Sequence, residues 1–130
     1  MAQDDWLVMV IDDDDMFREE IREMLESTGL RVVEFSSGLE WVESLEALDP
    51  DLVITDIQMP EMDGIEVVRH LRAHRPDIPV IAVSGGDSRG YVGNLEAAQL
   101  LGANYVMPKP VDAGLLVTTA FDLIEESAAA

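Results

Sequence analysis

The chain contains no cysteine, and this absence removes a group of functions at once. Without a thiol there is no disulfide framework, no thiolate nucleophile and no zinc site with thiolate ligands. The sequence also lacks an apolar run long enough to span a bilayer, so no membrane interaction is expected. Its first residues, MAQDDWL, lack the basic region of a signal peptide, which favours a cytoplasmic location.

Basic residues are scarce. The 130 residues include 27 aspartates and glutamates but only 8 lysines and arginines, and the formal net charge is −19. A surface this acidic repels phosphate backbones, so direct binding to nucleic acid is not expected. The same charge attracts divalent cations and basic partner surfaces, although for most of the acidic residues we favour a role in solubility. Lys109 is the only lysine.

Apolar residues make up 48% of the chain and are concentrated in short segments with the character of strands. Short segments rich in β-branched and large apolar residues are typical of strands buried in a parallel sheet. They occupy residues 6–11, 31–35, 52–55, 79–83 and 104–107. We expect one domain that extends over residues 1–130, with its core in residues 6–125.

Helical patterns separate these strands, and Gly29 and Asp112 mark the end of the first helix and the start of the last. The helix after the fourth strand is weakly specified at its start by Gly90 and Gly93 and becomes regular only over residues 94–101. Strands and helices alternate five times, which predicts an α/β fold with a parallel sheet covered on both faces. Apolar residues recur at helical spacing at Phe17, Ile21, Met24 and Leu25, at Trp41, Leu45 and Leu48, at Ile65, Val68 and Leu71, and at Leu116, Ala120 and Leu123.

Polar residues gather where the strands end. In an open parallel sheet, ligands bind at the carboxyl ends of the strands. The side chains expected there are Asp12 and Asp13 after the first strand, Asp56 after the third, Ser84 after the fourth and Lys109 after the fifth. Taken singly, each has a plain explanation as a loop, turn, cap or solvated residue. Together, at four strand ends, they predict a functional site.

The three carboxylates define the chemistry of this site. They cannot all remain ionised in close proximity without a counter-charge, and one lysine is insufficient. A hard divalent cation with oxygen ligands completes the set, with Mg²⁺ the simplest choice and Mn²⁺ an alternative. Lys109, the Ser84 hydroxyl and the amides of Gly85 and Gly86 suit a tetrahedral anion held beside Asp56. We therefore expect Asp56 to attack phosphorus and form an acyl phosphate.

These residues and their order resemble the receiver domain of two-component response regulators. The resemblance covers the chain from residue 6 to about residue 125, and the motif set is specific because its members are fixed jointly in order and position. It implies a flavodoxin-like, doubly wound (βα)5 fold with a five-stranded parallel sheet in the order 2-1-3-4-5. The motifs that carry it are Asp12-Asp13, the segment TDIQMPEMDG around Asp56, Ser84, and Lys109-Pro110.

The resemblance also implies a role for each acidic residue. Asp56 is the phosphoacceptor, and the phosphoryl donor is a histidine on a sensor histidine kinase or a histidine phosphotransfer protein. Asp13 and Asp56 bind Mg²⁺ directly, Asp12 acts mainly through water, and the main-chain carbonyl of Gln58 is a further ligand. We expect a switch with Mg²⁺-dependent self-phosphorylation and autodephosphorylation, rather than an enzyme. Its output passes to an unknown downstream effector through the face formed by the fourth helix, fifth strand and fifth helix.

The remaining motif residues belong to the switch. The resemblance implies that Ser84 and Lys109 contact the phosphoryl oxygens and that the bond between Lys109 and Pro110 is cis. The family usually has an aromatic residue three positions before the lysine, but here that position is Val106. Tyr105 is adjacent, and period-two alternation turns it to the opposite face. We hypothesise that the loop after the fourth strand carries the conformational change instead.

Two other functions are alternatives. A small phosphatase of the haloacid-dehalogenase type also presents acids, a hydroxyl and a lysine at strand ends, and Asp12-x-Asp14 superficially fits its opening motif. Such an enzyme would leave Asp56 without a role, and the chain is short for one. A receiver-like scaffold that is never phosphorylated is disfavoured by the intact set of acids, hydroxyl and lysine.

His70 and His74 lie four residues apart, a spacing that can bind a metal on a helix. Arg69, Arg72 and Arg75 lie beside them. We therefore favour a solvated basic face for this segment, which can also serve as a docking surface.

Overall fold

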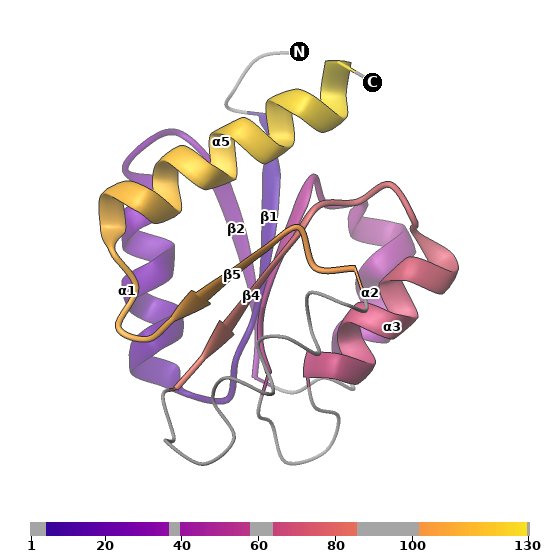
Figure 1. Cartoon of the computed structure of the whole chain (residues 1–130), viewed down its shortest axis with the longest axis horizontal. Coiled ribbons are helices and arrows are strands. Elements are labelled where there is room, and N and C mark those ends of the chain that lie inside the picture. Colours follow the sequence, from indigo (N-terminus) through magenta and orange to yellow (C-terminus); the bar gives the residue numbers. More distant parts are fainter. Residues whose placement is uncertain (1–4, 37–39, 58–63, 86–101, 130) are drawn as a thin grey trace.

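Five segments form one parallel sheet in a computed structural model, in which residues 5–36, 40–57, 64–85 and 102–129 are described (Figure 1). The strand order is β2-β1-β3-β4-β5, and every pair of neighbours is parallel. The predicted doubly wound α/β fold with strand order 2-1-3-4-5 is therefore confirmed. The strands are β1 (Leu7–Ile11), β2 (Arg31–Phe35), β3 (Leu52–Asp56), β4 (Val80–Ser84) and β5 (Tyr105–Pro108).

Helices lie on both faces of the sheet (Figure 1). One face is covered by α1 (Asp15–Glu26) and α5 (Ala113–Ala129), and the other by α2 (Glu40–Leu48) and α3 (Gly64–His74). The helix predicted over residues 94–101 lies outside the described residues. Among the described helices, none combines the length and the apolar composition needed to cross a membrane.

The sheet separates two apolar cores. Successive residues of β1 point to opposite faces: Val8 and Val10 belong to one cluster, and Met9 and Ile11 belong to the other. All four side chains are fully buried, which explains why this strand has a continuous apolar sequence. The helices complete the clusters with Ile21, Leu25, Leu116 and Ala120 on the first face, and with Trp41, Leu45, Val68 and Leu71 on the second.

Three strands, β3, β4 and β5, end one residue later than the sequence predicts. The ladder between β3 and β4 continues to the pair Asp56 and Val83, and the ladder between β4 and β5 continues to Ser84 and Pro108. The polar residues join the strands because a neighbouring strand still offers backbone hydrogen-bonding groups at that level. As a result, Asp56 and Ser84 are held by the sheet itself rather than by the loops that follow.

The helix boundaries follow local capping chemistry. The Asp14 side chain caps α1 by accepting hydrogen bonds from two amides of its first turn, and Gly29, with a φ of +95°, follows the end of that helix. Asp112 caps α5 as predicted, since its Oδ1 accepts a hydrogen bond from the Leu115 amide at 2.8 Å. Leu48, predicted to face inward, is exposed, because it is the last residue of α2 and the chain turns there.

Arg72, on α3, ties that helix to the sheet. Its guanidinium donates hydrogen bonds to the carbonyls of Gly102 at 2.9 Å and Ile78 at 2.7 Å, and to Asn104 Oδ1 at 2.8 Å. Asn104 Oδ1 also accepts a hydrogen bond from the Val80 amide at 2.9 Å. This network fixes the starts of β4, which ends at the predicted hydroxyl, and of β5, which the predicted lysine follows.

Candidate functional site

Three carboxylates converge where β1 and β3 end. The two strands are neighbours, so Asp12, which follows β1, lies beside Asp56, the last residue of β3. One oxygen from each of Asp12, Asp13 and Asp56 lies within 4.8 Å of the others. Asp12 and Asp56 are buried and Asp13 is exposed, so solvent reaches the cluster at Asp13.

Lys109 provides the positive charge of the cluster. Its Nζ lies 2.7 Å from Asp12 Oδ2 and 3.8 Å from Asp56 Oδ2. The residue directly follows β5, its amide donates a hydrogen bond to the Ser84 carbonyl at 2.7 Å, and its bond to Pro110 is cis. The ammonium therefore pairs more closely with Asp12 than with Asp56.

Asp12 is held from three directions. Its amide donates to the Phe35 carbonyl at 3.0 Å, its Oδ1 accepts a bond from the Asp14 amide at 2.8 Å, and its carbonyl accepts one from Arg18 Nη1 at 2.6 Å. Burial raises the pKa of the Asp12 carboxyl, while the hydrogen bond from Lys109 opposes that rise. The carboxylate is thus fixed in place and depends on a nearby cation for its charge.

Ser84 presents a hydroxyl with unused bonding capacity. The residue is fully buried, and its Oγ has no hydrogen-bond partner among the residues that the structure describes. A buried hydroxyl without a partner is costly, so this atom is suited to bond an oxygen of a ligand held at the strand ends. Gln58 and Gly86, the other residues predicted for this site, lie outside the described residues.

The donor set fits a hard divalent cation. Two buried carboxylates and one exposed carboxylate offer oxygen ligands to an ion that keeps part of its hydration shell. Lys109 supplies one positive charge against three negative ones, so the cluster retains room for further cationic charge. Within the described parts of the chain, no other group of three potential ligands comes together.

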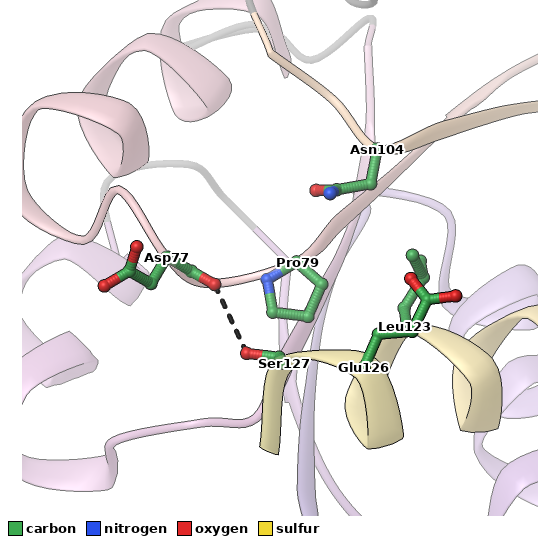
Figure 2. A pocket seen from close by; sticks show the side chains of 6 residues that line it. All are labelled: Asp77, Pro79, Asn104, Leu123, Glu126 and Ser127. Carbon is green, nitrogen blue, oxygen red and sulfur yellow. Dashed lines mark hydrogen bonds between the residues drawn. The ribbon is translucent and has the colours of Figure 1, made fainter. Parts of the chain in front are cut away.

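Other cavities lie away from these strand ends. One of about 410 Å³ opens at the opposite end of the sheet, where β4 begins and α5 ends (Figure 2). Two of its lining residues are joined by a hydrogen bond of 3.4 Å, which Ser127 Oγ donates to the Asp77 carbonyl. It brings together no cluster of potential metal ligands of the kind found at the strand ends. The lining residues are Asp77, Pro79, Asn104, Leu123, Glu126 and Ser127.

The position of the usual aromatic residue is filled by Val106. Its side chain is half-buried and packs against the cluster on the α2 and α3 face, whereas Tyr105 is 39% exposed. Met107, two positions after Tyr105 and therefore on the same face of the strand, belongs to the cluster on the α1 and α5 face. The predicted separation of Val106 and Tyr105 onto opposite faces agrees with this alternation.

The two histidines form a stack rather than two independent solvated groups. The rings of His70 and His74 lie 4.1 Å apart, and His70 meets the buried Trp41 ring edge to face at 5.1 Å. Burial, and secondarily the neighbouring His74, lower the pKa of His70. The predicted solvated basic face is therefore wrong for His70, which packs against the core.

Two contacts to the site were not predicted from the sequence. The Phe17 ring lies under Lys109, with its centroid 4.1 Å from Nζ, and Arg18 binds the Asp12 carbonyl. Helical spacing marks Phe17 only as a core residue, and nothing in the spacing separates Arg18 from the other charged residues of α1.

Comparison with known proteins agrees with this geometry. The sequence model of the response regulator receiver domain matches residues 8–121. The chain is 37% identical over 121 residues to the sensor kinase CckA of Brucella abortus (strain 2308), covering 92% of this chain and 12% of CckA. It is 35% identical over 103 residues to the response regulator MprA of Mycobacterium ulcerans (strain Agy99), covering 79% of this chain and 43% of MprA. The chain thus spans less than half the length of these two relatives.

Solved structures show the same fold. A response regulator receiver domain protein from Clostridium thermocellum superposes with a TM-score of 0.87 at 28% identity, covering 95% of this chain and 98% of that one. Full-length FixJ from B. japonicum superposes with a TM-score of 0.85 at 28% identity, covering 95% of this chain and 59% of FixJ. Sequence match, fold and the acidic cluster lead to one conclusion: the chain belongs to the response regulator receiver domain family.

Proposed function

We propose that this receiver accepts a phosphoryl group on Asp56 from a phosphohistidine of a sensor histidine kinase or a histidine phosphotransfer protein. The observation that carries the proposal is the position of Asp56, a buried carboxylate beside two other acids and 3.8 Å from the ammonium of Lys109. An oxygen of Asp56 attacks phosphorus, a new P–O bond forms, and the P–N bond to the histidine breaks. The imidazole leaves with the electron pair of that bond and takes up a proton.

The other site residues stabilise the transferred group. We propose that the Lys109 ammonium and the Ser84 hydroxyl bond phosphoryl oxygens as negative charge builds on them. Asp13 and Asp56 would hold Mg²⁺ directly, with Asp12 acting through water and the main-chain carbonyl of Gln58 as a further ligand. Bound there, the cation would neutralise charge on the acids and on the phosphoryl oxygens. We propose a switch that undergoes this chemistry on itself rather than an enzyme.

The structure disfavours the phosphatase alternative, because the second acid of its motif is already engaged in a helix cap. In that alternative Asp14 would have to be available to donate a proton, but its Oδ1 accepts hydrogen bonds from the amides of Met16 and Phe17 as the cap of α1. The geometry therefore favours Asp56 as the reacting carboxylate.

Intact mass measurement tests the proposal. The chain is incubated with phosphoramidate and Mg²⁺, and a gain of one phosphoryl group is expected in the wild type and in Asp122→Asn, an exposed control on α5. Asp56→Asn should gain none. Phosphodonor turnover that survives in Asp56→Asn but disappears in Asp12→Asn would instead identify a phosphatase, and a wild type that is never modified would identify a scaffold.

We also propose that the response to phosphorylation starts at Ser84 and does not require an aromatic residue at position 106. Val106 is half-buried against the apolar cluster on the α2 and α3 face, so the change would propagate through the loop after β4 to a downstream partner. Hydrogen exchange with and without beryllofluoride, a phosphoryl mimic, would show altered protection in residues 84–93. Unchanged protection there would reject this part of the proposal.

A further inference from the structure

Lys109 rests on an aromatic face. Its Nζ lies 4.1 Å from the centroid of the Phe17 ring, and the same atom lies 2.7 Å from Asp12 and 3.8 Å from Asp56. We propose that Phe17 is a positioning residue, whose ring holds the Lys109 ammonium between the two carboxylates. The inference rests on the proposed function, because it assigns a task to Phe17 only if Lys109 assists phosphoryl transfer to Asp56.

The position of Phe17 is itself fixed. Its amide donates a hydrogen bond of 3.2 Å to the Asp14 side chain that caps α1. Its ring is only 7% exposed and belongs to the core cluster that also contains Met107 and Leu116. The first turn of α1 therefore provides a fixed surface for the lysine to meet.

A lysine in this position needs such a surface. Its ammonium is a compact charge on a flexible four-carbon stem, and it can turn its donors toward either acid. Asp12 attracts it at shorter range than Asp56 does. The negative face of an aromatic ring attracts the ammonium without accepting its proton, and so restricts its position while leaving its donors available. With the ring in place, the ammonium stays within reach of Asp56 when the phosphoryl group arrives.

A cavity lies beside the same residues. It has a volume of about 340 Å³, and its wall includes Phe17, Gly85, Lys109 and Pro110. The lysine thus has open space next to it as well as the two carboxylates, and the ring is a contact that limits its entry into that space. The side chain of Lys109 is nevertheless only 15% exposed, as expected for a group held in place.

Lys109 is the only lysine in the chain, and this makes its position directly observable. Protein labelled with ¹³C at lysine alone gives one set of side-chain NMR signals. Protons above an aromatic ring are shifted upfield by its ring current, so the Lys109 Hε signals should be displaced upfield in the wild type. Phe17→Leu keeps an apolar side chain but removes the ring, and the signals should return to the position of a free lysine. Phe17→Tyr should retain the displacement.

The matched control is Phe121→Leu. It makes the same chemical change on α5, where the ring meets Trp6 at 6.0 Å and has no ring contact with Lys109 in the described structure. We expect the initial rate of phosphorylation by phosphoramidate with Mg²⁺ to fall about two- to fivefold in Phe17→Leu, the factor that corresponds to one cation–π contact. Phe121→Leu should leave both the rate and the lysine signals unchanged.

The two readouts separate the possible failures. Lys109 signals that are identical in the wild type and Phe17→Leu would overturn the inference, even if both proteins are phosphorylated. Equal rate losses in Phe17→Leu and Phe121→Leu would also overturn it, because they would show a general effect of core packing. A wild type with the upfield signals but no phosphoryl gain would refute the proposed function itself, and with it the role of Phe17 in that function.

Discussion

Replacing Asp56 with asparagine should make the metal-free protein more stable, although it removes the proposed phosphoacceptor. One oxygen from each of the three acids lies within 4.8 Å of the others, and at an effective dielectric constant of about 20 two charges at that distance repel by roughly 3.5 kcal/mol. Lys109, 3.8 Å away, attracts Asp56 by roughly 4.4 kcal/mol on the same scale. The two repulsions exceed this attraction, but solvent screens the exposed Asp13. We therefore expect a gain of about 1–2 kcal/mol in the free energy of unfolding.

Magnesium at tenfold its Kd should offset this difference in stability. A ligand that binds only the folded state at tenfold its Kd adds about 1.4 kcal/mol of stability, and the wild type retains all three carboxylates to bind it. Urea unfolding at pH 7.5, with and without MgCl₂ at constant ionic strength, measures both effects. Asp122→Asn, the same change at an exposed site on α5, should stay within about 0.5 kcal/mol of the wild type and respond equally to magnesium. A loss of stability in metal-free Asp56→Asn, or an undiminished magnesium effect in that variant, would refute the electrostatic reasoning.

Two further predictions concern the α3 side of the sheet. Arg72→Met removes hydrogen bonds to the carbonyls of Gly102, Ile78 and Pro76 and to Asn104 Oδ1, and it should lower the free energy of unfolding by about 2–4 kcal/mol. The control Arg69→Met, at an exposed position of the same helix, should lower it by no more than about 0.5 kcal/mol. Equal losses in the two variants would contradict a role for the network. Because burial lowers the pKa of His70 in the folded state, the unfolded chain binds a proton at this residue more readily than the folded chain does. The contribution of neutral His70 to the free energy of unfolding is therefore complete above the ordinary histidine pKa of about 6.5 and is lost as the pH falls below it. Urea unfolding between pH 7.5 and 5.5 should show a smaller pH dependence in His70→Gln than in the wild type, and an identical dependence would show that His70 is not the group responsible.

Much of the fold could be predicted because each strand carries its own signal. A run such as residues 7–11 is apolar throughout, and in the structure its side chains divide between two cores. Strand order was not contained in these local patterns. It came from the resemblance to receivers, and the sheet confirms it. The ends of the strands were harder to predict, since Asp56 and Ser84 join the sheet only because a neighbouring strand pairs with them.

The acidic run at residues 12–15 shows what a sequence pattern leaves undetermined. Four identical side chains perform four tasks: Asp12 pairs with Lys109, Asp13 lies exposed at the edge of the cluster, Asp14 caps α1 and Asp15 binds Arg18 at 2.5 Å. What separates them is their position relative to the last residue of β1 and the first turn of α1, because one further residue rotates a carboxylate by about 100° once the helix has begun. Arg18 lies one turn along that helix and reaches back toward its N-terminus, where it binds both Asp15 and the Asp12 carbonyl. An insertion of a single residue between β1 and α1 would therefore exchange these tasks without changing the composition of the run, and the convergence on Asp56 would be lost.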